Sequence, residues 1–294
     1  MHQGQACAPL KLQRSFNQAS GHCELPVLHT AGGLVGGDQL DFDIAAGPHS
    51  RALITTVAAQ KAYGSVGRSR LHPAGQWARQ QVDVQLEQGS ALEWLPQELV
   101  LYDGALFEQT LQVRLAGDAT FLAAEVVRLG RTAAGEGLGA GRWRSALTIQ
   151  RQLNDGPRWE LVDRLELGGD AIDSAHGLAG QPVFGSLVWA APQPLAAPAQ
   201  SALLDQCRAA RHGLEGTMAC GLLNQGLIAR YRGASTQAAR FWFSRIWALL
   251  RQVQQQAPPE LPRVWPFQEQ PWNPQAFSMN AADDAPTATV LSCT

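Results

Sequence analysis

The feature that most constrains this chain is a succession of short apolar runs between residues 50 and 166. Apolar and polar residues alternate through 82–86, 107–115 and 159–165, and Gly, Pro, Asp or Asn recurs about every ten residues. Alternation with a period of two is typical of half-buried strands, and the turn residues separate one strand from the next. The pattern predicts a protein that is mainly β over most of its length.

Two segments depart from this period and predict α-helices in the C-terminal third. Residues 199–214 are rich in Ala, Leu, Gln and Arg, and residues 236–256 place large apolar side chains near helical spacing. Between them, residues 217–223 and 227–231 are separated by a short turn sequence that ends in glycine. That arrangement predicts a β-hairpin.

The composition and the sequences at the two ends of the chain argue against several classes of protein. We expect one domain over residues 1–265 and a loosely ordered tail over 266–294, where Pro, Asn and Asp recur. The net charge of -2 argues against a nucleic-acid binder. Residues 1–12 lack the pattern of a secretory signal, and no apolar stretch approaches the ~18 residues of a membrane span, so we expect a cytoplasmic protein that does not enter membranes.

Charge is distributed unevenly, although it nearly cancels overall. Residues 83–125 contain eight acids and one base, whereas residues 206–252 contain seven arginines and one acid. Such polarity suits docking to partners of complementary potential, and it equally suits solvated faces on opposite sides of one domain. Only 16% of the residues are charged, which predicts a surface largely covered by partners and poor solubility of the isolated chain.

The sharpest local motif is the glycine-rich segment 28–38, Leu-His-Thr-Ala-Gly-Gly-Leu-Val-Gly-Gly-Asp. No Gly-Lys-Ser/Thr follows it, and its glycine spacing is not that of a dinucleotide-binding loop. A phosphate-binding loop is therefore excluded. The pattern favours a structural glycine turn that ends at Asp38.

Three further motifs place charged residues beside apolar strand runs, and they span residues 55–63, 94–105 and 125–136. A buried charge without a partner is very costly. We therefore expect internal ion pairs, such as Lys61 with Glu98 and Arg131 with Glu136.

These four motifs, in this order, resemble the urease accessory protein UreD family, also called UreH. The resemblance runs from about Pro9 to Trp265, and it includes the hairpin sequence 230–233, the last-helix sequence 247–251 and the closing sequence 262–265. It implies a urease maturation factor, not an enzyme. The implied fold is mainly β, with stacked or irregular strand layers that are β-helix-like or sandwich-like, and it has two helices in the C-terminal third. It also implies binding of UreF, binding of the nickel-carrying GTPase UreG through UreF, and docking on the urease apoprotein. An internal water-filled passage is the implied nickel route.

A transient Ni²⁺ route needs spaced, weak oxygen or imidazole ligands, because a tight closed site would trap the ion. The chain has no Cys/His cluster with closed-site spacing, so we predict no closed metal site and no tightly bound cofactor. The candidates along the route are Asp38, Glu125 and Asp163, with His29 as an entrance ligand. The alternatives are a buried ion pair or turn cap for each acid, and a hydrogen-bonded loop histidine.

Other residues carry two interpretations each. Lys61 is either a polar wall or gate of the passage or the partner of Glu98 or Asp103 in a salt bridge. Glu98 and Arg131 are likewise passage-wall or structural residues.

On the last predicted helix, Trp242, Trp247 and Arg251 are candidates for a partner interface, since aromatic and arginine side chains are favoured there. Packing in the core is the alternative for these three residues.

Two other classes of function compete with the maturation factor. One is a β-rich hydrolase that uses acids such as Glu98 and Asp103, although the sequence has no nucleophile elbow, zinc signature or assignable acid pair. The other is a plain binding module that uses the acidic middle segment.

Overall fold

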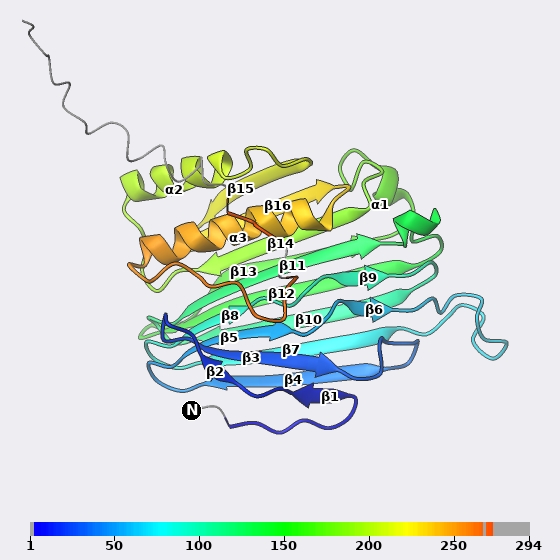
Figure 1. Cartoon of the computed structure of the whole chain (residues 1–294), viewed down its shortest axis with the longest axis horizontal. Coiled ribbons are helices and arrows are strands. Elements are labelled where there is room, and N and C mark those ends of the chain that lie inside the picture. The colour runs from blue at the N-terminus through cyan, green and yellow to red at the C-terminus, as the bar shows by residue number, and fades with distance from the viewer. Residues whose placement is uncertain (1–2, 267–268, 273–294) are drawn as a thin grey trace, which may run out of the picture.

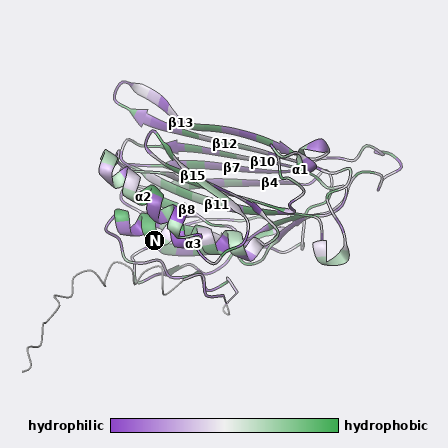
Figure 2. Cartoon of the chain, turned by 90° about the horizontal axis from the view of Figure 1, so that it is seen from above, coloured by the Kyte–Doolittle hydropathy of each residue, from purple (hydrophilic) through white to green (hydrophobic). Residues whose placement is uncertain are grey.

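The computed structural model describes residues 3–266 and 269–272. Two β-sheets lie face to face, and helices cover the outer face of the larger sheet, so the molecule has three layers (Figures 1 and 2). The five-stranded sheet has the order β13 (Gly156–Leu167), β12 (Arg142–Leu153), β10 (Leu106–Leu115), β7 (Ala78–Leu86) and β4 (Gln39–Ala46).

The eleven-stranded sheet has a main path of eight strands and three short strands beside it. The path is β1 (Leu10–Leu12), β3 (Cys23–His29), β5 (Arg51–Thr56), β8 (Ala91–Trp94), β11 (Thr120–Leu129), β14 (Val183–Ala190), β16 (Gly226–Gly233) and β15 (Thr217–Leu223). The others are β2 (Phe16–Asn17), β6 (Gln60–Ala62) and β9 (Leu99–Leu101). The helices are α1 (Asp170–Asp173), α2 (Ala197–Ala209) and α3 (Thr236–Val253), with a 3-10 turn η1 at Thr132–Ala134.

From β3 to β12 the chain winds as a coil that alternates between the two sheets. Each long strand lies parallel to the preceding one in the same sheet, as in the β3–β5–β8–β11 and β4–β7–β10–β12 series. After β12 the pairings become antiparallel, and β13, β14, β16 and β15 complete the two sheets. The prediction of a mainly β, layered fold is confirmed, since the first part is β-helix-like and the whole is a sandwich.

The strands and helices predicted from the spacing of apolar residues are found at the predicted positions. The alternating segments form β7, β10 and β13, the glycine-containing hairpin forms β15 and β16, and the two helical segments form α2 and α3. The helix α3 begins after Ser235, whose hydroxyl accepts a hydrogen bond from the Ala238 N–H at 3.1 Å and so caps the first turn. The four-residue helix α1 was not predicted, because a single turn has no period to detect.

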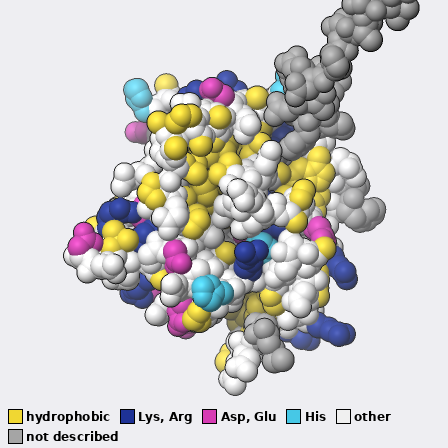
Figure 3. Space-filling model, turned by 90° about the vertical axis from the view of Figure 1, so that its left-hand side faces the viewer, with side chains coloured by type: hydrophobic (Ala, Val, Ile, Leu, Met, Phe, Trp, Pro, Cys, Tyr) yellow, Lys and Arg dark blue, Asp and Glu magenta, His cyan; other side chains and the backbone are white. Residues whose placement is uncertain are grey.

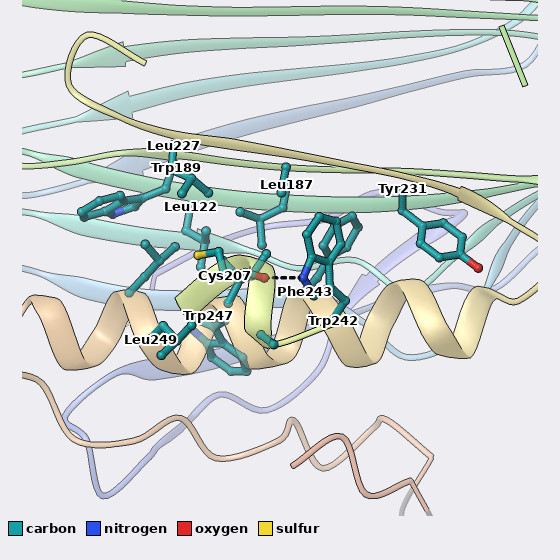
Figure 4. Packing of buried hydrophobic residues seen from close by; sticks show 14 of the residues in the cluster. Leu122, Leu187, Trp189, Cys207, Leu227, Tyr231, Trp242, Phe243, Trp247 and Leu249 are labelled. Atoms are coloured by element: carbon teal, nitrogen blue, oxygen red, sulfur yellow. Dashed lines mark hydrogen bonds between the residues drawn. The ribbon is translucent and has the colours of Figure 1, made fainter. Parts of the chain in front are cut away.

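A continuous apolar core, which we call the outer core, fills the space between α2, α3 and the large sheet (Figure 4). Trp242 and Trp247 are at most 1% exposed, and the Trp242 indole N–H donates to the Cys207 carbonyl at 2.9 Å, which ties α3 to α2. Arg251 is also fully buried. The interface interpretation of Trp242, Trp247 and Arg251 is therefore wrong, because large apolar side chains at helical spacing turn their common face to the sheet.

Two ion pairs join the acidic segment 83–125 to the arginine-rich segment 206–252. Glu93 binds Arg251 at 2.6 and 2.8 Å and also accepts the Trp247 indole N–H at 2.7 Å. Glu98 binds Arg240 at 2.7 Å. The expected Lys61–Glu98 pair is thus wrong. These four charges act inside the molecule, whereas a docking role for the other charges of the two segments stays a prediction.

Most of the predicted tail, residues 267–268 and 273–294, lies outside the described residues. Within the described part, Glu269 pairs with Arg240, and the Pro271 carbonyl accepts a hydrogen bond from Arg245 at 2.7 Å. None of the described helices has the length and apolar character needed to cross a membrane. The face seen in Figure 3 shows hydrophobic side chains in its upper half, bordered by charged groups of both signs.

Candidate functional site

A belt of polar side chains crosses the space between the two sheets, which is otherwise apolar. Its members occupy inward-facing positions in successive strands, where their neighbours two residues away are mostly apolar. We call these seven residues the polar belt: Gln80, Gln109, Ser145 and Asp163 from the five-stranded sheet, and Glu125, Ser186 and Arg230 from the large sheet.

Strand register aligns most of the belt. In the five-stranded sheet Gln109 pairs with both Gln80 and Ser145, and in the large sheet Ser186 pairs with both Glu125 and Arg230. Two rows of polar side chains therefore face each other across the sandwich. The belt separates the inter-sheet core into two apolar clusters, one around Phe121 and Ile149 and the other around Phe107 and Trp143.

A cavity of about 410 Å³ lies along the belt, and its lining includes Gln80, Gln109, Ser145, Glu125 and Ser186 together with His29 and Lys61. At ~30 Å³ for each molecule, it has room for on the order of ten waters. The Gln60 side-chain nitrogen, which also belongs to the lining, has no hydrogen-bond partner among the described residues. The cavity lining is mainly apolar, so water is expected where the polar side chains of the belt cross it.

Glu125 is the central ionisable group of this cavity. Its carboxylate accepts a hydrogen bond from the Gln109 amide, which also donates to the Ser145 hydroxyl at 3.2 Å. Burial raises the pKa of Glu125 to about 7, although the Gln109 hydrogen bond and the Arg230 charge both act to lower it. The carboxyl therefore gains or loses its proton near neutral pH.

Asp163 lies beside Glu125 but is already paired. Arg230 binds it across the two sheets and also packs over the Phe184 ring, 5.5 Å from the ring centroid. Asp163 does not belong to the cavity lining. The structure thus brings the two predicted acids close together, with Asp163 in the ion pair that was its alternative interpretation.

His29 and Asp38 lie at the glycine-rich segment. His29 contributes to the cavity lining, and burial lowers its pKa. Asp38 lies outside the lining and accepts the Val35 N–H at 2.8 Å, so it caps its own turn. At Gly33 a Cβ would lie 2.6 Å from the Tyr63 ring, and this close approach makes the segment a structural turn.

Lys61 lines the cavity, and among the described residues no carboxylate lies within 4.0 Å of its ammonium group. The alternative of a salt bridge to Glu98 or Asp103 is wrong, because Glu98 is bound to Arg240 instead. The wall or gate role of Lys61 stays a prediction.

Glu98 and Arg131 lie outside the cavity lining. The predicted pair of Arg131 with Glu136 is confirmed on the loop after β11, where Arg131 also packs over the Tyr102 ring, 5.0 Å from its centroid. Both residues therefore serve structural contacts.

Five belt residues were not predicted as site residues from the sequence, namely Gln80, Gln109, Ser145, Ser186 and Arg230. Each is a polar residue at the position where the strand's alternation calls for an apolar one. Gln109, for example, shares its side of β10 with Phe107, Leu111 and Val113. Such exceptions to the period are a pattern that could have identified the belt.

Among the described residues no group of three or more His, Cys, Asp and Glu side chains is placed to hold a metal ion. The cavity lining includes a carboxylate, two hydroxyls and an imidazole from four different strands: Glu125 on β11, Ser145 on β12, Ser186 on β14 and His29 on β3. Glu125 lies next to the two hydroxyls, because it pairs with Ser186 in the sheet and shares the Gln109 amide with Ser145.

Comparison with known proteins gives a family for this arrangement. Residues 1–266 match the family described as UreD urease accessory protein. The chain belongs to the UreD family. It is 61% identical to the urease accessory protein UreD of Synechococcus sp. (strain WH7805) over 96% of this chain and 89% of that protein. It is 62% identical to UreD of Parasynechococcus marenigrum (strain WH8102), over 97% and 92%, and 58% identical to UreD of Prochlorococcus marinus (strain MIT 9313), over 92% and 85%.

Membership of the UreD family gives the chain a role in urease maturation, as an accessory protein without catalytic activity of its own. The hydrolase alternative is thereby wrong. Its two acids also fail to form a pair, since Glu98 is neutralised by Arg240.

Proposed function

We propose that this UreD-family protein is a scaffold and metallochaperone subunit that passes nickel to urease. In this proposal it binds UreF, reaches UreG through UreF, docks on the urease apoprotein and carries Ni²⁺ only transiently. The proposal sets this activity in the cytoplasm, where free thiols such as Cys207 and Cys220 stay reduced.

The observation that carries the proposal is the position of Glu125 in the inter-sheet cavity. Its carboxyl, with a pKa of about 7, binds a proton weakly enough at neutral pH for a divalent cation to displace it. One carboxylate, hydroxyls and water hold Ni²⁺ loosely, as a route requires and a storage site does not.

In this proposal Lys61 controls the entry of cations at the end of the cavity that His29 lines. Its ammonium group, which has no carboxylate partner among the described residues, repels a divalent cation at distances of a few Å. Entry from that end therefore requires a partner that supplies compensating negative charge. This effect supports the gate interpretation of Lys61 over that of a passive wall.

The first experiment is co-expression of UreF, UreG and the urease apoprotein with and without this chain. We expect nickel in purified urease and urease activity to rise only when the chain is present. Equal nickel content and equal activity in both cultures would refute the maturation role in this system.

The second experiment tests the route with Glu125→Ala and the matched control Glu87→Ala, an exposed acid at the β7–β8 turn. Glu125→Ala should lower nickel delivery while UreF is still recovered in a pull-down, and Glu87→Ala should change neither. If Glu125→Ala loses UreF, Glu125 is a structural residue and the cavity route is unsupported.

Asp38→Ala and Asp163→Ala extend the test to the other predicted acids. We expect both to lower urease activation without loss of UreF binding. A normal rate of activation would leave Asp38 as a turn cap and Asp163 as an ion-pair residue.

A further inference from the structure

The large sheet is interrupted at the level of Glu125. The chain leaves β5 at Thr56 and enters β6 at Gln60, and it leaves β8 at Trp94 and enters β9 at Leu99. The long strand β11 runs past both breaks, pairing with β8 over 120–123 and with β9 over 127–129. Between these pairings, residues 124–126 have no strand partner on that side.

The sequence explains this gap. Pro96 has no N–H and cannot donate to a strand ladder, so the segment after β8 must leave the sheet. The Gln97 side chain closes part of the opening, since its amide nitrogen donates to the carbonyls of Thr56 at 3.1 Å and Val57 at 2.8 Å. The motif at 94–98 is therefore a built interruption held by side-chain hydrogen bonds.

The two faces of the sheet meet at this gap. Pro96, Ala124 and Val126 line the inter-sheet cavity, and the same three residues line a small pocket of about 20 Å³ beneath α3 on the opposite face. An intact sheet would separate these spaces by a continuous hydrogen-bonded backbone. Here no ladder of paired strands separates them along residues 124–126 on that side.

A short segment of the chain covers the outer side of the gap. We call residues 262–265 the lid, and a turn bond from the Trp265 N–H to the Pro262 carbonyl at 2.9 Å shapes it. The Trp265 indole N–H donates to the Thr55 hydroxyl at 2.9 Å, and the Val264 carbonyl accepts from the Gln97 amide at 3.0 Å. Trp265 also lines the small pocket and packs near Trp247, with ring centroids 6.5 Å apart.

We propose that the gap is a second mouth of the inter-sheet cavity, opening toward α3, and that the lid closes it. The lid is held by these two hydrogen bonds, by the packing of Trp265 against Trp247 and the outer core, and by contacts of Arg263 with Phe16 and Glu24. None of these contacts belongs to a strand ladder, so the lid can detach while both sheets stay intact. Arg240 lines the outer side and pairs there with both Glu98 and Glu269. This inference deepens the proposed nickel route and rests on it only for the identity of the ion that passes.

The test measures access to Ala124→Cys in the full-length chain, using a small cationic methanethiosulfonate reagent. Peptide mass spectrometry counts modification at residue 124 separately from that of the native cysteines. We expect slow labelling when the lid is intact and labelling about tenfold faster or more with Trp265→Ala, which removes a hydrogen bond and the ring contact. Trp159→Ala, an exposed tryptophan on the other sheet, is the matched control and should leave the rate unchanged.

Two milder variants keep the proposal testable if Trp265→Ala does not fold. Trp265→Phe keeps a ring but loses the hydrogen bond, and it should speed labelling about fivefold, the effect of one hydrogen bond. Thr55→Val keeps the side-chain shape but loses both the acceptor for Trp265 and the donor to the Leu95 carbonyl at 2.6 Å, so it should speed labelling at least as much. Equal labelling rates at residue 124 in the parent and all folded lid variants would overturn the proposal.

The labelling experiment contains neither nickel nor partner proteins. Equal labelling rates would therefore refute the second mouth without bearing on the maturation role. Conversely, normal opening of the lid with no effect of this chain on urease nickel content would refute the maturation role alone.

Discussion

The large sheet carries the buried carboxylate Glu93 on its outer face and the partly buried carboxylate Glu125 on its inner face, and the two are held in different ways. On the outer face Glu93 receives three hydrogen bonds from Arg251 and Trp247 of one helix. On the inner face Glu125 receives one hydrogen bond from Gln109 and borders a cavity. A fully paired carboxylate fixes a helix to a sheet, whereas a partly paired one beside water is free to bind and release.

The largest expected effect on stability comes from a substitution in the outer core. Trp242→Ala should lower the free energy of unfolding by about 4 kcal/mol, because it leaves a large cavity and removes the hydrogen bond to Cys207. Denaturant titration of the purified protein measures this change. Trp159→Ala is the control and should stay within about 0.5 kcal/mol, since Trp159 is 60% exposed.

The second expected effect is a pH dependence of stability that comes from Glu125. Glu125 has its pKa raised to about 7 in the fold, so the native state favours the protonated form. Its full contribution to stability is present below about pH 4.5 and is lost as pH rises through 7. Glu125→Gln removes this dependence, so the variant should gain about 3 kcal/mol relative to the parent between pH 4.5 and 8.

Unfolding curves at both pH values measure this difference. A constant gap between parent and variant would mean that Glu125 titrates normally and that the cavity does not disfavour its charge.

A smaller effect compares neighbours on the two faces of β14. Leu187 belongs to the outer core, whereas Ser186 lines the cavity. Leu187→Ala should cost about 3 kcal/mol, while Ser186→Ala should cost less than about 1 kcal/mol, because water can replace the lost hydroxyl. Similar costs at both positions, measured by thermal or chemical unfolding, would contradict the division into a dry core and a wet belt.

The smallest effect on stability concerns the exposed apolar side chains of β13. Replacing Trp159 and Val162, which are 60% and 56% exposed, with serine should leave the free energy of unfolding within about 0.5 kcal/mol. The same change should raise the concentration at which the isolated chain stays in solution. An unaltered solubility limit, measured after centrifugation, would show that other surfaces cause self-association.

The local spacing of apolar residues was enough to predict much of the secondary structure. The alternation in β7, β10 and β13 and the helical spacing in α3 were strong enough to locate these elements. The coil between two sheets could not be predicted, because the alternation of a strand does not say in which sheet the next strand will lie.

The site was predicted in part. Glu125 stood out as an acid within an apolar strand and does line the cavity, whereas the pairing of Glu98 with Arg240 joins residues 142 positions apart and leaves no local pattern. The aromatic and arginine residues of α3 are of the types that are common at protein–protein interfaces. Their burial in the structure shows that they pack against the chain's own large sheet instead.

The coil also sets the order in which this protein can be completed during synthesis. Strands β8 and β11 are made long before α3, which supplies the tryptophans and arginines that cover them. At translation rates of ~5–20 residues per second, the apolar outer face of the large sheet stays bare for roughly 10–30 s on the ribosome. A nascent chain of this kind is therefore a substrate for general folding chaperones before it acts in the maturation of urease.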